Sequence, residues 1–203
     1  MPSTPQHHIQ QDGHAQQLTL HPATVEATQA LGAELGRQLC AGDLVILTGE
    51  LGAGKTTLTQ GLGAGLQVRE GVISPTFVLS RIHPSLVGGP NLVHVDAYRL
   101  SDPSEVDTLD LEATAPEAVT VVEWGAGKVE HLSSSRLDLT LARAALPRDT
   151  TTASWEFDDE GSDEPRTLTL SATGPDWEPA RWEQLRAALE ATLKSFSNPE
   201  GQP

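Results

Sequence analysis

Residues 44–57 read LVILTGELGAGKTT, and this stretch decides the fold. Its glycines and its Lys-Thr pair match the pattern G-x-x-x-x-G-K-[ST], in which a loop wraps phosphate groups with successive backbone N–H groups. The apolar run before the loop is typical of a buried parallel strand, and the residues after it can form a helix whose N-terminus faces the anion. This order predicts an α/β, P-loop NTPase-like fold with a mainly parallel sheet flanked by helices.

The residue types in the loop fit the chemistry of phosphate binding. Small residues at Gly52, Ala53 and Gly54 let the backbone come close to the phosphates. Lys55 supplies a positive charge for the outer phosphates, and the hydroxyl of Thr56 is placed to bind a magnesium ion. The loop therefore predicts a nucleotide with Mg²⁺ as its ligand.

Composition limits the classes of function. The chain has 203 residues, enough for one sizeable core, and its 13 basic and 28 acidic residues give a net charge of −15. Because a direct footprint on nucleic acid needs clustered Lys and Arg, we expect no DNA partner, and we expect any other nucleic acid to be held by another protein. The sequence has no membrane-length apolar run and no signal-peptide pattern, so we expect a cytoplasmic protein without a membrane partner.

The chain is expected to form one domain with decorated ends. Residues 1–20 are predicted to be a disordered polar tail, and residues 21–175 to form the P-loop domain. Residues 176–203 predict a C-terminal helix and a frayed end. The apolar stripe of this helix is expected to pack on the same domain, with docking onto a partner as the alternative. Inside the domain, alternating apolar residues predict an antiparallel meander that extends or covers the parallel sheet: Leu137, Leu139, Leu141, Trp155, Phe157, Leu168 and Leu170.

An amphipathic helix is predicted before the first core strand. Residues 24–40 carry apolar residues at steps of four, with Thr24 as the candidate N-cap. The chain's single cysteine, Cys40, excludes an internal disulfide. We expect its side chain to be a small buried hydrophobic group on this helix.

Two acidic residues end predicted strands after the loop. Asp96 ends the apolar stretch 92–95, and Glu123 ends the stretch 118–122. Because open α/β sheets bind ligands at the carboxyl ends of parallel strands, the two carboxylates can converge on one magnesium ion. Asp96 and Glu123 are therefore the candidate catalytic residues, and which of them binds the metal directly stays open.

The sequence Ser-Pro-Thr-Phe at residues 74–77 has two interpretations. Residues 76–79 have strand character, and a turn before an edge strand would explain the proline. Nucleotide-dependent switch segments also often lie one helix after a phosphate loop. The segment is therefore either a plain turn or a second segment that faces the phosphates.

The chain carries four motifs in this order: GELGAGKTT, SPTF, HVDAYRL and VVEWG. In this it resembles the TsaE (YjeE) family of small bacterial ATPases, which are needed for threonylcarbamoyladenosine modification of tRNA. The resemblance covers residues 22–174. It implies a P-loop ATPase that acts on a TsaB–TsaD complex, does not transfer the threonylcarbamoyl group itself, and is slow until its partners stimulate it.

The resemblance also implies roles for individual residues. Residues 74–77 would form a switch-like loop, Trp124 would flank the nucleotide, and Thr56 and Glu123 would bind Mg²⁺. Asp96 would be the second acid, for water or metal. The residues implied to bind ATP are Glu50, Leu51, Gly52, Ala53, Gly54, Lys55, Thr56 and Thr57.

Two other classes of protein share a phosphate loop. A small-molecule kinase needs basic lid and acceptor segments, and between Thr57 and Glu123 the chain offers only Arg69, Arg81 and Arg99. A guanine-nucleotide switch reads its base with an Asn-Lys-x-Asp motif, which the sequence lacks. The kinase remains the alternative to a partner-directed ATPase.

Overall fold

The computed structural model describes residues 16–100, 102–144 and 164–197. The strands are β1 (Gln16–Leu20), β2 (Leu44–Thr48), β3 (Ser80–His83), β4 (Asn91–Asp96), β5 (Ala118–Glu123), β6 (Arg136–Arg143) and β7 (Arg166–Thr173). The helices are α1 (Val25–Gln38), α2 (Lys55–Gly65), α3 (Pro103–Asp107), α4 (Leu111–Thr114) and α5 (Pro179–Ser197), with short 3-10 helices η1 (Ala115–Glu117) and η2 (Glu130–Leu132).

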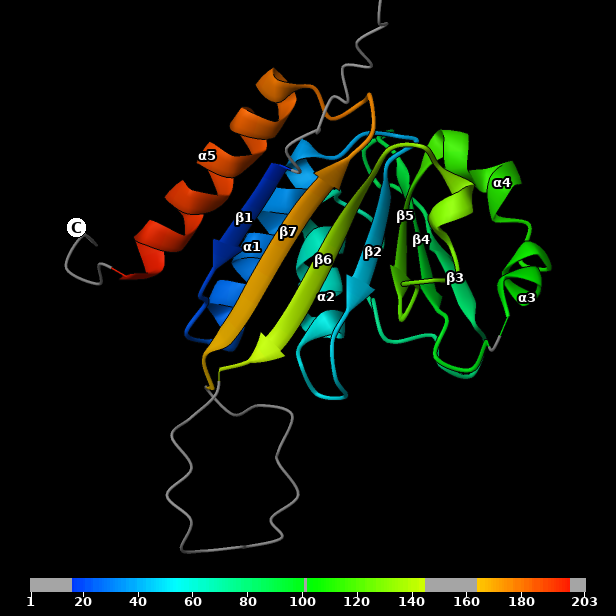
Figure 1. Cartoon of the computed structure of the whole chain (residues 1–203), viewed down its shortest axis with the longest axis horizontal. Helices are drawn as coiled ribbons and strands as arrows, with labels where there is room; N and C mark the ends of the chain where they lie inside the picture. Colours follow the sequence, from blue (N-terminus) through cyan, green and yellow to red (C-terminus); the bar gives the residue numbers. More distant parts are fainter. Residues whose placement is uncertain (1–15, 101, 145–163, 198–203) are drawn as a thin grey trace, which may run out of the picture.

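The described strands form one mixed sheet in the order β1-β7-β6-β2-β5-β4-β3 (Figure 1). The strand β2 lies at its centre and pairs in parallel with β5 on one side and β6 on the other. The strand β4 continues the parallel part beyond β5, and β3 closes that edge as an antiparallel strand. The predicted α/β fold with a mainly parallel centre is therefore confirmed.

The predicted antiparallel meander is present and is wider than expected. The strand β7 pairs antiparallel with β6 on one side and with β1 on the other. Leu137, Leu139 and Leu141 point into the core, whereas the alternating polar side chains lie on the opposite face of β6. The two aromatic residues predicted to alternate in this meander, Trp155 and Phe157, lie outside the described residues.

The prediction of a disordered tail over residues 1–20 is wrong for its last five residues. Gln16–Leu20 form β1, and this strand pairs with β7 in a register that sets Leu20 against Leu168. The polar composition of this segment fits an edge strand with one exposed face, which local composition cannot distinguish from a disordered tail. The rest of the predicted tail and the frayed end at 198–203 lie outside the described residues.

Helices cover both faces of the parallel part of the sheet. On one face, α1, α2 and α5 share a core with the inward residues of the strands (Figure 1). Trp182, Leu185 and Leu189 of α5 belong to this core, so the predicted packing of the C-terminal helix on the same domain is confirmed. On the other face, Val106 of α3 and Leu111 of α4 cover β2, β4 and β5.

The N-terminal helix begins as predicted and ends earlier. Thr24 caps α1, because its hydroxyl accepts a hydrogen bond from the Ala27 N–H at 3.1 Å. The helix ends at Gln38, so Cys40 lies in the turn that follows and is exposed. The prediction that Cys40 is buried on the helix is therefore wrong. Among the helices in the described ranges, none is long and apolar enough to cross a membrane.

Glycines bring α1 and α2 into backbone contact. A Cβ atom added to Gly32 on α1 would collide with the carbonyl oxygen of Leu58, and one added to Gly61 on α2 would collide with that of Gln29. Gly36 and Gly65 repeat this arrangement one turn further along. The helix that begins at the phosphate loop is thus held against α1 at a distance that only glycine permits.

We expect Gly61→Ala to destabilise the fold although alanine is normally the better helix residue. The added methyl group would force the two helices apart and lower the free energy of unfolding by roughly 1–3 kcal/mol, the range for overpacked cores. Ala64→Gly, at an exposed position of the same helix, is the control: it measures the effect of helix propensity without the close contact, and we expect it to lower the free energy of unfolding by about 1 kcal/mol. Chemical denaturation measures both variants. A Gly61→Ala variant as stable as the wild type would show that the close contact is not needed.

Candidate functional site

The predicted phosphate loop lies between the carboxyl end of β2 and the start of α2. Gly52 and Gly54 have positive φ angles of 74° and 102°, which glycine adopts without strain. Gly54 is also the N-cap of α2 and offers no side-chain cap, so the first N–H groups of the helix stay available to an anion. The loop therefore has the backbone of a phosphate cradle, with Glu50 and Leu51 exposed at its tip.

The ammonium group of Lys55 is held against the loop. Its Nζ donates hydrogen bonds to the carbonyl oxygens of Gly49 at 2.9 Å and Glu50 at 3.0 Å. The same nitrogen lies 4.0 Å from the centroid of the Trp124 ring, which is within cation–π range. Burial lowers the pKa of Lys55, whereas the carboxylates of Glu123 and Asp96 act in the opposite direction.

A buried hydrogen-bonded chain joins the loop to β5. The hydroxyl of Thr56 contacts both carboxylate oxygens of Glu123, at 3.2 and 3.4 Å. His94 Nε2 lies 2.8 Å from Glu123 Oε1, and both side chains are almost fully buried. The carboxylate of Glu123 is thus fixed from two sides, by the first turn of α2 and by β4.

Asp96 lies beside Glu123 and binds a different set of groups. The two residues are register partners on β4 and β5, so their strands end together as predicted. Asp96 Oδ2 accepts hydrogen bonds from Ser74 Oγ at 2.9 Å and Thr76 Oγ1 at 2.6 Å, and Oδ1 accepts one from the Tyr98 N–H at 3.0 Å. Asp96 therefore ties the 74–77 segment to the edge of the sheet.

The 74–77 segment is a turn and not a strand. Residues 76–78 form a turn, and the edge strand β3 begins only at Ser80. The strand character predicted for residues 76–79 is wrong, because Ser74 and Thr76 bind Asp96 and the Val78 and Leu79 N–H groups return to the Pro75 carbonyl. The structure thus shows a turn before the edge strand β3, and the turn places Ser74 and Thr76 against Asp96; a role facing phosphates stays a prediction.

Aromatic side chains form one wall of the site. Trp124 follows Glu123 with a positive φ of 61°, an uncommon angle for a large side chain, and its ring packs on Tyr98 with centroids 5.2 Å apart. The Trp124 N–H donates to the Leu47 carbonyl at 2.9 Å, which fixes the residue beside the central strand. The ring of Trp124 lies beside the loop, where it contacts Lys55, and its predicted place next to a nucleotide stays a prediction.

The oxygen atoms around Thr56 fit a magnesium ion. Magnesium prefers hard oxygen ligands and is usually bound through one or two carboxylates together with substrate phosphates and water. The Thr56 hydroxyl and the Glu123 carboxylate supply such a pair in mutual contact. Within the described ranges, no group of three or more His, Cys, Asp or Glu side chains could hold a metal alone. These residues therefore fit an ion that arrives with a nucleotide.

Two site residues escaped prediction from the sequence. His94 lies inside the HVDAYRL motif, but only the pairing of β4 with β5 shows that it supports Glu123. Arg143 ends β6 and approaches the loop from the other side, next to Gly52. The sequence signal that could have identified Arg143 is a basic residue at the end of a predicted strand, because the carboxyl ends of strands parallel to β2 all lie at the same edge of the sheet.

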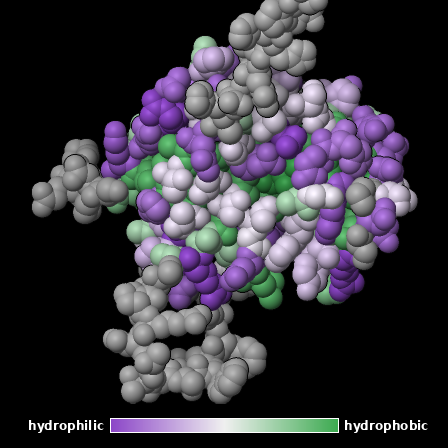
Figure 2. All heavy atoms as spheres, in the orientation of Figure 1, coloured by the Kyte–Doolittle hydropathy of each residue, from purple (hydrophilic) through white to green (hydrophobic). Residues whose placement is uncertain are grey.

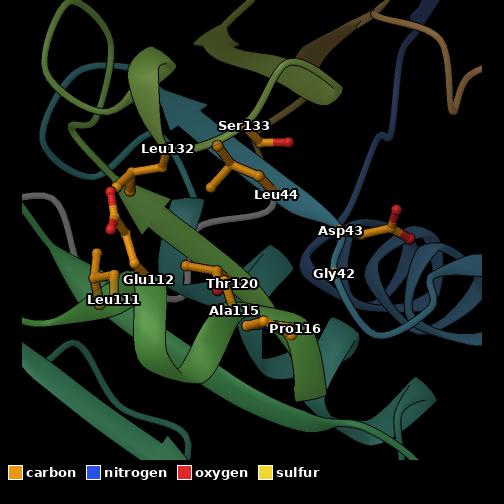
Figure 3. A pocket seen from close by; sticks show the side chains of 10 residues that line it. All are labelled: Gly42, Asp43, Leu44, Leu111, Glu112, Ala115, Pro116, Thr120, Leu132 and Ser133. Atoms are coloured by element: carbon orange, nitrogen blue, oxygen red, sulfur yellow. The ribbon is translucent and has the colours of Figure 1, made fainter.

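A separate pocket lies at the opposite end of the sheet. It has a volume of about 220 Å³, and its lining includes Gly42, Leu44 and Thr120, near the starts of β2 and β5 (Figure 3). The Thr120 hydroxyl is buried there without a hydrogen-bond partner, and the remaining walls are mainly apolar. The acids and the lysine discussed above lie at the other ends of these strands, so this pocket is not part of the candidate site.

Large apolar side chains are exposed around the loop. Leu51 at the loop tip is 87% exposed, Phe77 in the turn is 85% exposed, and Tyr98 after β4 is 63% exposed. Figure 2 shows hydrophobic surface at the lower edge of the molecule, toward which β2 points in Figure 1. We call Leu51, Phe77 and Tyr98 the apolar rim of the site.

Comparisons with known proteins agree with this geometry. The model of the family "Threonylcarbamoyl adenosine biosynthesis protein TsaE" matches residues 22–150. The TsaE protein of Streptomyces coelicolor is 52% identical over 148 residues, which cover 72% of this chain and 91% of the relative. The TsaE protein of Mycobacterium tuberculosis H37Rv is 49% identical over 140 residues, covering 66% and 83% of the two chains.

A solved structure shares the fold. The crystal structure of YdiB from Bacillus subtilis superimposes with a TM-score of 0.62 at 29% sequence identity, over 87% of this chain and 96% of YdiB. A P-loop-like fold, a match to more than half of the chain and relatives near 50% identity lead to one conclusion. The chain belongs to the TsaE family of tRNA threonylcarbamoyladenosine biosynthesis proteins.

Proposed function

We propose that this chain binds ATP with Mg²⁺ at the 49–57 loop and hydrolyses it. In this proposal the chain acts on a TsaB–TsaD complex during threonylcarbamoyladenosine modification of tRNA, and ATP hydrolysis accompanies that action. The observation that carries the proposal is the contact between Thr56 Oγ1 and the buried Glu123 carboxylate. It joins the end of a phosphate loop to an acid on the neighbouring strand, as P-loop NTPases require for Mg²⁺.

The loop and the start of α2 supply the binding groups for the phosphates. The uncapped N–H groups of α2 face the loop, and the helix dipole favours negative charge there. Lys55 already directs its ammonium at the loop carbonyls, 2.9 and 3.0 Å away, so the charge is held where the outer phosphates would lie. Bound Mg²⁺ would add charge neutralisation and orient the phosphates.

The two acids have different tasks in this proposal. Glu123 faces Thr56 and is oriented by His94, which suits a magnesium ligand. Asp96 occupies the neighbouring position and suits the second acid, which orients the attacking water. Asp96 Oδ2 accepts hydrogen bonds from Ser74 and Thr76, so this oxygen becomes available to water only when the 74–77 turn moves, whereas Oδ1 accepts one hydrogen bond, from the Tyr98 N–H.

This arrangement explains why we propose a slow enzyme that partners stimulate. A protein that binds the apolar rim can shift the 74–77 turn, because Phe77 belongs to both. Release of Ser74 and Thr76 from Asp96 would then complete the catalytic site. The net charge of −15 opposes direct binding to tRNA, so the effect on tRNA is indirect.

Replacing each of the two acids by its amide tests the assignment of their roles. We expect Glu123→Gln to raise the Mg²⁺ concentration needed for ATP binding, because the ion loses a charged ligand. We expect Asp96→Asn to bind Mg-ATP almost normally and to hydrolyse it about 100-fold or more slowly, the usual range for a lost general base. Titration of ATP at several Mg²⁺ concentrations and single-turnover hydrolysis measure the two effects. Normal binding and hydrolysis in both variants would contradict the site.

Association with a TsaB–TsaD complex tests the partner proposal. We expect the complex to bind this chain more tightly with Mg-ATP than without it and to raise ATP turnover, because a ligand shifts a conformational equilibrium only through differential affinity. Phe77→Ala should weaken association by about tenfold, as expected for an exposed aromatic anchor. Val87→Ala, an apolar position that is 60% exposed in the loop between β3 and β4, is the control.

Two results would contradict the partner proposal. One is association that is indifferent to nucleotide and to Phe77. The other is tight binding of tRNA by this chain alone at physiological salt, which the net charge opposes. Biolayer interferometry with immobilised chain measures both kinds of binding.

A further inference from the structure

The end of β6 forms the outer wall of the phosphate loop. The strand runs parallel to β2, and its last residues continue past the pairing of Thr48 with Thr140. A Cβ atom on Gly49 would collide with the Leu141 carbonyl oxygen, and one on Gly52 would lie 2.6 Å from Arg143 Nη2. The loop is thus packed directly against this strand end, with the guanidinium group of Arg143 at its middle.

Arg143 is placed to meet an anion in the loop. It is the last residue of β6, its side chain is 36% exposed, and its Nε lies 3.9 Å from a carboxylate oxygen of Glu164 at the start of the next described segment. The same Glu164 oxygen also pairs with Arg166 Nη1 at 3.2 Å. A shift of Arg143 towards a ligand would therefore leave Glu164 with a cationic partner.

The charge of the site favours a second cation. Asp96 and Glu123 place two buried carboxylates near the loop, and a polyphosphate would add further negative charge. Lys55 is shared between loop carbonyls and these acids. A guanidinium presents several N–H donors in a planar fork that matches phosphate oxygens, which suits Arg143 for this task.

We infer that Arg143 is an additional phosphate-binding residue of this site, which contacts the polyphosphate of the nucleotide beside Gly52 and acts on binding affinity. The inference rests on the proposed function, because it assumes that the loop binds a nucleotide. The sequence motif places phosphate binding in residues 49–57 alone, whereas this inference adds a phosphate contact from the end of β6.

The test compares equilibrium affinities of five chains. Wild type, Arg143→Gln, Arg143→Lys, Arg136→Gln and Lys55→Ala are titrated with ATP and with inorganic tripolyphosphate, which lacks base and ribose, by displacement of a fluorescent ATP analogue. Arg136 is the matched control, since it lies on the same strand at the opposite edge and has its own carboxylate partner, Asp138. Thermal unfolding of each variant confirms that the fold is retained.

We expect Arg143→Gln to lower the affinity for both ligands about tenfold or more. The affinity of Arg143→Lys should lie between those of Arg143→Gln and the wild type, and Arg136→Gln should bind both ligands normally. Unchanged affinity in Arg143→Gln, while Lys55→Ala loses binding, would overturn the inference and leave the proposed function standing. A wild-type chain that binds no ATP would instead contradict the proposed function. Weaker ATP binding with unchanged tripolyphosphate binding, or a tripolyphosphate that does not compete even in the wild type, would overturn the phosphate contact.

Discussion

The parallel pairing of β2 with both β5 and β6 is the constraint on which the site depends. It brings the carboxyl ends of three strands to one edge, where the phosphate loop leaves β2. Glu123 reaches the loop from β5 and Arg143 reaches it from β6. The glycine contacts between α1 and α2 then fix the helix that begins at Lys55, so the loop is held at both ends.

Two carboxylates at this edge are buried, and both are hydrogen-bonded to polar groups of the chain. Burying a carboxylate costs free energy unless it is hydrogen-bonded. Glu123 uses Thr56 and His94, whereas Asp96 uses the 74–77 turn. The first arrangement holds an acid against the Thr56 hydroxyl, which suits the proposed magnesium ion. The second couples an acid to a surface turn, through which the proposed partner would act.

Much of the fold and half of the site follow from local sequence. The loop, the two strand-ending acids and the capping residue Thr24 are local patterns, and each lies where the sequence predicts. Errors occur where a distant segment decides the outcome. Gln16–Leu20 are ordered because β7 provides a strand to pair with, and Thr76 turns because Asp96 binds its hydroxyl.

The residues that the sequence did not assign also depend on distant pairing. His94 acquires a role only when β4 lies beside β5, and Arg143 only when β6 lies beside β2. Cys40 shows the limit of periodicity, because the apolar pattern continues past the point where α1 ends. Element boundaries and contacts between strands far apart in sequence cannot be read from a single helical or strand period.

The most direct test of the account is the affinity for Mg-ATP of Lys55→Ala compared with the wild type, measured by isothermal titration calorimetry. The account predicts that the wild type binds and that Lys55→Ala, with its fold intact, binds at least about 100-fold more weakly, because the charge at the loop carbonyls is lost. Equal affinity in the two chains would show that the nucleotide does not bind at this loop.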